Sequence, residues 1–300
     1  MINVELKGGA VKEFENGTTP AEIAKSIGAG LYKSVCCAKV DGDLCDLRTP
    51  LEKDCKVELL TFDNVDGQKT FWHTASHVLA QAVKRLYPNA KCAIGPAVDN
   101  GFYYDFDVEK PFSPEDLEKI KAEMKKIVKS GLELERVELS PEEAEKKLEE
   151  MNEPYKVELV KEHSDKGEHI TFYKQGEFID LCAGPHLMSV APIKAIELTA
   201  CTGAYWRGDA NNAQLCRVYG VAFPKASMLE EHLKKLEEAK LRDHNKIGRE
   251  LEYFTTVDCI GQGLPVMLPK GARVIQLLQR WVEDVEQAKG CLLTKTPLFA

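Results

Sequence analysis

The spacing of apolar residues changes several times along the chain, and this limits the fold classes open to it. In the first sixty or so residues, short apolar runs alternate with turns, which is typical of β-strands. From residue 71 onward, apolar side chains recur at helical spacing, and strand-like runs return between residues 170 and 223. We therefore expect a multidomain α+β protein.

Length and composition agree with this expectation. The chain has 300 residues, of which 44% are hydrophobic and 29% are charged, so two or three folded domains are expected. It has no apolar run of about eighteen residues and no signal-peptide pattern at its amino terminus. We therefore expect a cytoplasmic protein without a membrane partner, and its ten cysteines are expected to be reduced.

The net charge bears on nucleic-acid partners. A formal charge of −8 argues against a protein that coats nucleic acid by bulk attraction. A tRNA partner needs only a local basic face, so the charge neither supports nor excludes RNA binding.

The first module has a capped helix between strands. Strands are expected at residues 2–6, 10–14, 35–40 and 57–62. Between the second and third strands, the helix signals are an N-cap, a proline at the first position, a capping-box acid and a glycine stop, at Thr19, Pro20, Glu22 and Gly28. Two strands, a helix and two further strands in so short a segment indicate a small β-grasp module.

A helix is expected at residues 71–87, and it carries two histidines. His73 and His77 are four residues apart, so both imidazoles leave one face of the helix about one turn apart. On its own, such a pair is as compatible with ordinary surface or core histidines as with a shared site, so it only weakly indicates a site.

A second pair lies far downstream. Cys182 and His186 are also four residues apart, but the glycine and proline at positions 184 and 185 indicate a tight turn. Three nitrogen donors and one sulfur form a set of the kind that binds zinc. Asp180 adds a carboxylate that can orient a histidine or hold a substrate ammonium group.

Three charged helices and an amphipathic helix are also expected. Two charged helices begin after Ser113 and Ser140, each with proline and acids in its first turn. Residues 226–246 form a third, without a strong apolar face, which favours a bridge between domains. One long amphipathic helix at residues 271–289 is too little to bury a core, so the chain is expected to stop partway into a further domain.

Several motifs occur in the order of a known family. They are HTASH at 73–77, IGP at 94–96, GFYYDF at 101–106, EPYK at 153–156, DLCAGPH at 180–186, GAYWRGD at 203–209 and LCRVYG at 215–220. Together they resemble the editing domain of bacterial-type threonyl-tRNA synthetases, and the first module resembles the TGS domain of that family. Residues 242–251 resemble its entry into the aminoacylation domain, and residues 268–272 with 294–297 resemble its dimer-forming first class II motif.

The resemblance implies a division of the chain into four parts. These are a TGS-like β-grasp domain at 1–62, a two-part α+β editing domain at 63–224, a linker helix at 225–247 and an incomplete class II aminoacylation domain at 248–300. The second and third class II motifs are absent from this sequence. ATP with magnesium, and the zinc of the catalytic domain, are therefore expected only in a longer parent protein, which is also expected to be a homodimer.

The implied reaction is hydrolysis of serine wrongly attached to tRNA(Thr). The implied catalytic residues are His73, His77, Lys156, Asp180, Cys182 and His186. Gly95 and Tyr104 are implied to bind the substrate, with Tyr104 facing the amino acid or the terminal adenosine. His73 is expected nearest the terminal ribose, Lys156 at the developing oxyanion and Asp180 at the ammonium or hydroxyl group of serine.

Metal content and catalysis leave alternatives open. The same four-residue pattern binds zinc in related alanyl-tRNA editing domains, so zinc at His73, His77, Cys182 and His186 is an alternative to the metal-free pocket that we expect. A non-catalytic fragment that binds tRNA or mRNA, and a structural zinc domain, are the competing functions. The sequence leaves the oligomeric state of this chain open.

Overall fold

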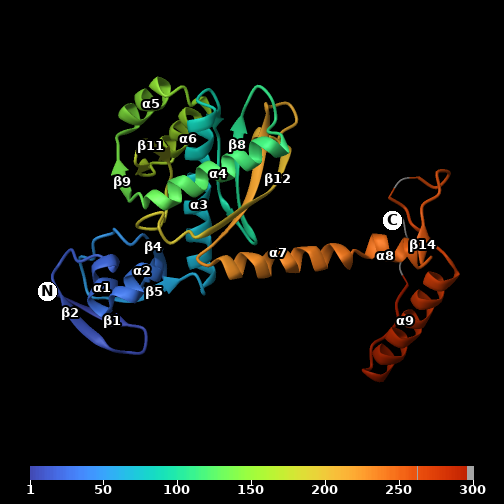
Figure 1. Cartoon of the computed structure of the whole chain (residues 1–300). Coiled ribbons are helices and arrows are strands. Elements are labelled where there is room, and N and C mark those ends of the chain that lie inside the picture. Colours follow the sequence, from blue (N-terminus) through green and yellow to red (C-terminus); the bar gives the residue numbers. More distant parts are fainter. Residues whose placement is uncertain (262, 296–300) are drawn as a thin grey trace. The chain divides into compact units, whose positions relative to one another are not determined.

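The computed structural model describes residues 1–261 and 263–295, which fall into two compact units, Met1–Glu230 and Glu231–Ala300. Helices and several separate sheets occur along the same chain, so the predicted α+β class is confirmed (Figure 1). Residues 296 and 297 of the expected class II motif lie outside the described residues.

The first sheet lies at the amino terminus and has the order β2-β1-β5-β3-β4. Its strands are Ile2–Leu6 (β1), Val11–Phe14 (β2), Val35–Val40 (β3), Asp43–Cys45 (β4) and Cys55–Thr61 (β5). β1 and β5 are parallel neighbours, while the other pairs are antiparallel. This mixed sheet with its helices is the predicted β-grasp module, with one strand (β4) and one short helix, Ala29–Ser34 (α2), that the pattern does not predict.

The predicted capping box of the first helix, Pro20–Ile27 (α1), is present. The Glu22 amide donates to the Thr19 hydroxyl at 3.3 Å, and the Thr19 amide donates to the Glu22 carboxylate at 2.8 Å. These bonds satisfy two amide groups that a helix start leaves without intrahelical partners. Apolar residues of α1, β1, β3 and β5 form a core of their own.

Helix α3 (Val65–Leu86) joins the two parts of the first unit. It begins six residues before the predicted start at residue 71. It contacts β3 and β5 of the first sheet and also three strands of a second sheet, Ala97–Val98 (β7), Gly101–Asp107 (β8) and Gln214–Phe223 (β13). The indole of Trp72 donates to the carbonyl of Ala222 at 2.9 Å, which ties the helix to the end of β13.

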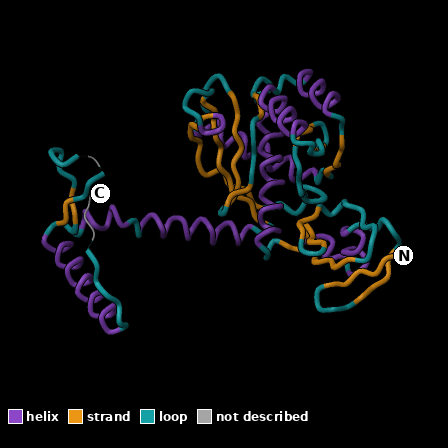
Figure 2. Tube along the Cα trace, turned by 180° about the vertical axis from the view of Figure 1, so that it is seen from behind, coloured by secondary structure: helices purple, strands orange, loops and turns teal. Residues whose placement is uncertain are grey.

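The second and third sheets complete the first unit (Figure 2). The second has the order β12-β13-β8-β6, with β7 paired to β8, and its further strands are Lys91–Cys92 (β6) and Ala195–Tyr205 (β12). The third has the order β11-β10-β9, with strands Leu134–Glu138 (β9), Thr171–Gln175 (β10) and Phe178–Leu181 (β11). Buried side chains from α3 and from both sheets share one hydrophobic core.

Three further helices belong to this unit. Ser113 and Ser140 cap α4 (Pro114–Ser130) and α5 (Pro141–Glu150) as predicted. The sequence pattern does not predict α6 (Pro154–Asp165), because only Lys156 and Val160 of this helix are buried and no clear apolar face marks it.

The second unit contains little buried surface. The helix predicted at residues 226–246 is wrong in its last part, because α7 ends at Leu241 and a new helix, His244–Glu250 (α8), begins after Asp243. The Asp243 carboxylate accepts from the amides of Asn245 and Lys246, which caps α8. A short hairpin, Phe254–Thr255 (β14) and Val266–Met267 (β15), precedes the predicted amphipathic helix, Pro269–Ala288 (α9).

A helix that spans a membrane must be both long and predominantly apolar. No helix in the part of the chain that the structure describes meets both requirements.

The central position of α3 predicts the effect of shortening its side chains. Leu79 is fully buried, so Leu79→Ala is expected to lower the free energy of unfolding by about 2–5 kcal/mol through lost burial and a residual cavity. Leu86 on the same helix is 40% exposed, and Leu86→Ala is the matched control, with an expected loss below about 1 kcal/mol. Urea unfolding measures both, and equal losses would contradict this packing.

Candidate active site

A cavity of about 360 Å³ opens beside α3, α6 and the loop after β11. Most of the residues predicted for the site line this cavity, namely His73, His77, Gly95, Lys156, Asp180 and Cys182. His186 and Tyr104 are fully buried behind the cavity wall. The structure therefore gathers the predicted residues in one region but exposes only some of them to a ligand.

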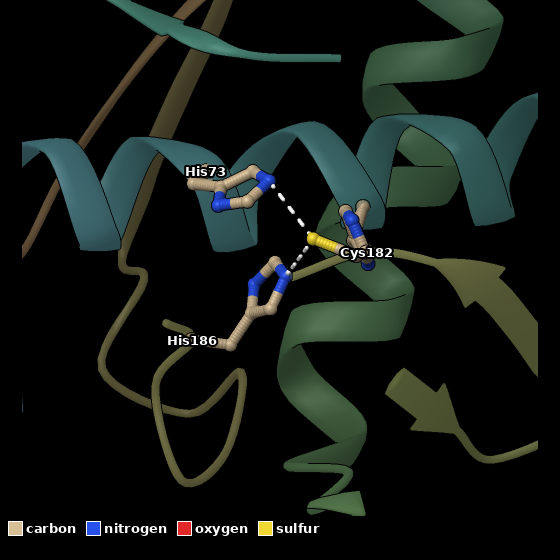
Figure 3. A group of neighbouring side chains, drawn as sticks. His73, Cys182 and His186 are labelled. Carbon is tan, nitrogen blue, oxygen red and sulfur yellow. Dashed lines mark hydrogen bonds between the residues drawn. The ribbon is translucent and has the colours of Figure 1, made fainter. Parts of the chain in front are cut away.

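The two pairs, His73 with His77 and Cys182 with His186, meet at the wall of this cavity. His73 and His77 come from α3, while Cys182 and His186 come from the loop after β11. Figure 3 shows the rings of His73 and His186 on either side of the Cys182 sulfur. The sulfur of Cys182 lies 3.3 Å from Nε2 of His73 and 3.2 Å from Nε2 of His186. One potential ligand atom from each of the four residues lies within 4.8 Å of all the others, so this cluster can hold a metal ion.

The turn between Cys182 and His186 depends on a glycine. Gly184 has a φ of +78°, and a Cβ atom there would lie 2.3 Å from the hydroxyl of Tyr173. The peptide bond from Gly184 to Pro185 is cis, and the Gly184 amide donates to the Cys182 sulfur at 3.3 Å. A residue with a side chain would therefore displace the loop that carries the thiol.

Hydrogen bonds define the tautomer of His186. The Thr74 hydroxyl donates its one proton to the Thr70 carbonyl at 3.0 Å and lies 3.2 Å from Nδ1 of His186. Nδ1 must therefore be the donor in the second contact, and Nε2 keeps a lone pair that faces the sulfur of Cys182. This nitrogen can accept a hydrogen bond or bind a metal.

The environment keeps two of the imidazoles neutral. Burial lowers the pKa of His73 to about 4, against the weaker opposing effect of Asp180. Burial, followed by the neighbouring His77 and His73, holds the pKa of His186 well below its usual range. His77 has a buried Nδ1 without a hydrogen-bond partner among the described residues. Near pH 7 the cluster thus presents nitrogen lone pairs.

Asp180 is the centre of a second, charged group beside these rings. Its carboxylate lies 2.8 Å from Nζ of Lys156, accepts from the Tyr104 hydroxyl at 2.6 Å and lies 3.7 Å from Nε2 of His77. Burial alone would raise the pKa of Asp180, but Lys156 and His77 lower it below its usual value. Burial alone would lower the pKa of Lys156, but Asp180 raises it, so both groups remain charged at neutral pH.

Gly95 forms part of the wall next to this charged group. A Cβ atom at Gly95 would lie 2.1 Å from the ring of Tyr104, so only glycine allows the chain to cross that ring. The Gly95 carbonyl accepts from the Ser76 hydroxyl at 2.6 Å, which holds the wall against α3. Burial and Asp180 raise the pKa of Tyr104 well above its usual value, so its hydroxyl stays protonated and continues to donate.

Sequence reasoning misses several residues that support or border the cavity. Thr74 lies inside the first histidine motif, so its position in the sequence indicates a role near the site. No local sequence signal marks Asp46, Arg48 or Tyr173. At the cavity mouth the missed residues are His163, Glu168 and His169, of which the first two are paired at 2.5 Å.

Comparisons with known proteins assign a class to these parts. Residues 2–61 match the family described as "TGS domain". Residues 170–219, which include Asp180, Cys182 and His186, match the "Threonyl and Alanyl tRNA synthetase second additional domain". The chain therefore contains a TGS domain and a domain described from threonyl- and alanyl-tRNA synthetases.

Whole-chain relatives narrow this class. The chain is 57% identical over 300 residues to a threonine--tRNA ligase of Clostridium perfringens, and 55% identical over 300 residues to one of Clostridium botulinum. It is 52% identical over 299 residues to one of Acetivibrio thermocellus. All of this chain is covered, but only 46 or 47% of each relative, so it spans about half their length. It belongs to the bacterial threonyl-tRNA synthetase family and corresponds to its amino-terminal region.

The low pKa of His73 predicts how this ring titrates. We expect the His73 ring signals in NMR spectra to change near pH 4 rather than near the ~6.5 of a free histidine side chain. Between these values the unfolded chain binds more protons than the folded one, so the free energy of unfolding should fall as the pH decreases through this window. Titration of His73 near pH 6.5 would contradict the buried, neutral state.

Proposed function

We propose that this chain is the editing part of a threonyl-tRNA synthetase and hydrolyses serine wrongly attached to tRNA(Thr). The observation that carries the proposal is the cavity in which neutral His73 lies beside the charged pair of Lys156 and Asp180. The relationship to threonine--tRNA ligases and the second additional domain support it. In this proposal, residues 1–62 are the TGS domain, 63–224 the editing domain, 225–247 the linker and 248–300 the start of the aminoacylation domain.

The similarity of threonine and serine explains why a synthetase would need a second, hydrolytic site. Serine lacks one methyl group of threonine, and such a difference in a pocket is worth about 1–3 kcal/mol, or roughly 10 to 200-fold in selection. Synthesis alone therefore releases some serine on tRNA(Thr). A separate cavity that admits serine and excludes the larger threonine corrects this error by hydrolysis.

The proposed reaction is attack of water on the ester carbonyl. The new bond forms between the water oxygen and the carbonyl carbon, and the carbon bond to the ribose oxygen then breaks, releasing serine and tRNA. His73 lies nearest the ribose and orients the leaving oxygen, while His77 and Cys182 hold the water. The proton that the water loses on attack passes to the leaving ribose oxygen, which becomes a hydroxyl group. The Lys156 ammonium stabilises the negative charge on the carbonyl oxygen.

Asp180 and Tyr104 serve substrate recognition in this proposal. The Asp180 carboxylate, which lines the cavity, binds the ammonium or hydroxyl group of serine. Tyr104 is fully buried and donates to that carboxylate, so we assign it an indirect role through Asp180. Gly95 shapes the wall next to the amino acid, and His186 holds Cys182 from behind.

The activity of the longer protein is also a proposal. We infer that the full-length parent attaches threonine to tRNA(Thr) with ATP and magnesium, binds a further zinc in its catalytic domain and forms a homodimer. Its relatives are named for this ligase activity. Because charged tRNA is used in translation, we assign the chain to the cytoplasm.

Zinc binding is the second candidate, and the donor set favours it. Nε2 atoms of His73 and His186 face one sulfur, and Nδ1 of His77 lacks a partner among the described residues. Three histidines and one cysteine are suitable zinc ligands. A zinc ion held there would act as a Lewis acid when bound, whereas we propose that hydrolysis uses the side chains and water alone.

Deacylation of Ser-tRNA(Thr) tests the proposed function directly. The purified chain is expected to release serine faster than buffer does and to spare Thr-tRNA(Thr). His73→Ala should reduce the rate by about 100-fold or more, the range expected for a lost acid or base group. His244→Ala, an exposed histidine in the second unit, is the matched control and should keep the rate.

Two outcomes would contradict this proposal. A chain that binds tRNA without hydrolysing either ester would instead support the non-catalytic RNA-binding function. A full deacylation rate in His73→Ala would remove this residue from the mechanism.

Metal removal separates the two states of the cluster. Because the proposed steps use only side chains and water, treatment with a chelator is expected to leave the deacylation rate unchanged. Added zinc should bind in a one-to-one ratio, measured by elemental analysis after dialysis, and Cys182→Ser should weaken this binding by removing the thiolate ligand. A rate that falls with the chelator and returns with zinc would show that the metal takes part.

A further inference from the structure

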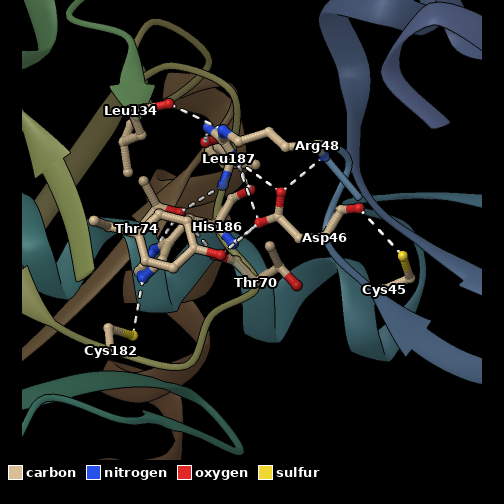
Figure 4. A network of polar contacts seen from close by, with 10 residues as sticks. Cys45, Asp46, Arg48, Thr70, Thr74, Leu134, Cys182, His186 and Leu187 are labelled. Atoms are coloured by element: carbon tan, nitrogen blue, oxygen red, sulfur yellow. Dashed lines mark hydrogen bonds and ion pairs between the residues drawn. The ribbon is translucent and has the colours of Figure 1, made fainter. Parts of the chain in front are cut away.

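A buried carboxylate from the amino-terminal sheet reaches the loop that carries His186. Asp46 directly follows β4 and is 6% exposed. Its Oδ2 accepts from the amide of His186 at 3.1 Å (Figure 4). The same oxygen accepts from the hydroxyl of Tyr173 at 2.9 Å. Asp46 belongs to the segment that matches the TGS domain, whereas His186 belongs to the segment that matches the second additional domain.

Arg48 binds backbone carbonyl groups of the same loop and of the neighbouring strand β9. Its guanidinium donates to the carbonyl of Leu187 at 2.7 Å, of Leu134 at 3.0 Å and of His186 at 3.3 Å. It also donates to Oδ1 of Asp46 at 3.0 Å, which keeps the two charges paired. The amide and the carbonyl of His186 are thus both bound by residues of the other domain.

This backbone clamp acts on the active site through a short path. The His186 ring contacts the Thr74 hydroxyl on one side and the Cys182 sulfur on the other. The Leu187 amide donates to the same Thr74 hydroxyl at 3.0 Å. A shift of the His186 backbone would therefore move the imidazole that holds the Cys182 thiol.

The energetics favour a positioning role for this clamp. Burying two charges costs several kcal/mol per ion, which the attraction between them offsets only when further hydrogen bonds are well made. Three of the bonds from this pair go to backbone groups of His186 and Leu187 in one loop, and a fourth goes to the Leu134 carbonyl of β9. A hydrophobic pair could fill the same space, but it could not hold the amide and carbonyls of the loop in one arrangement.

We infer that Asp46 is a positioning residue of the editing site, that Arg48 assists it, and that the TGS domain forms the support on which the catalytic loop rests. This inference depends on the proposed function, because it assigns a role in the same hydrolysis. It gives the amino-terminal domain a task within the site, in addition to any contact with RNA.

Asp46→Asn tests the inference with almost no change of shape. The amide group has one acceptor oxygen, so its NH₂ must face either the donors His186 and Tyr173 or the donors of Arg48. We expect kcat for Ser-tRNA(Thr) deacylation to fall about tenfold or more with KM nearly unchanged, since small displacements of catalytic groups cost that much. The His186 and Leu187 amides should also exchange hydrogen faster.

Two further variants keep the test decisive. Asp54→Asn changes an exposed carboxylate of the same domain that binds the amide of Asn3, and it should leave kcat unchanged. Arg48→Lys keeps a positive charge beside Asp46 but loses the planar fork that binds the carbonyls, so it should also lower kcat. This variant provides the measurement if Asp46→Asn does not fold.

The outcomes separate this inference from the proposed function. Wild-type kcat in a folded Asp46→Asn or Arg48→Lys variant would overturn it, as would a loss confined to KM, which would indicate a role in RNA binding. If the unmodified chain hydrolyses no Ser-tRNA(Thr), the proposed function fails. Amide exchange at His186 and Leu187 then decides alone whether Asp46 fixes the loop, and unchanged exchange overturns that claim.

Discussion

The buried charge on Asp180 is the constraint on which the candidate active site depends. An ionised carboxylate removed from water is costly unless positive charges and hydrogen-bond donors surround it. Here Lys156 comes from α6, Tyr104 from β8 and His77 from α3, so three elements must meet at one carboxylate. Their meeting places two charged side chains, Lys156 and Asp180, and the His77 ring in the wall of the cavity. Stability and proposed chemistry thus rest on the same contacts.

The neutral rings and the charged pair have complementary properties. Burial removes the proton from His73, while the same burial leaves Lys156 and Asp180 ionised because each compensates the other. A substrate ester entering this cavity would meet a fixed positive charge and unprotonated nitrogens at the same pH. This combination suits hydrolysis of an ester whose amino group is itself charged.

Local signals in the sequence predict much of the fold but less of the site. The capping boxes at Thr19, Ser113 and Ser140 act within one helical turn, so the sequence predicts these helix starts correctly. The break at Asp243 lies in a charged helix pattern that continues past it, and α6 has too few buried residues to be recognised. Spacing and family resemblance predict the cluster of histidines and cysteine. They do not predict Asp46, because its partner His186 lies 140 residues away and pairing at that distance has no local pattern.

The contacts that Asp46 and Arg48 make with the His186 loop limit how the two domains can be separated during evolution. If the second additional domain (residues 170–219) moved alone into another protein, the amide and carbonyl of His186 and the carbonyl of Leu187 would lose the acceptor and donors that Asp46 and Arg48 now provide. A new host would have to supply matching groups before the transferred domain could work. Gene fusions that preserve the proposed editing activity should therefore carry both domains together. Substitutions at Asp46 should be selected against, because Asp46 binds a loop that a distant part of the same gene encodes.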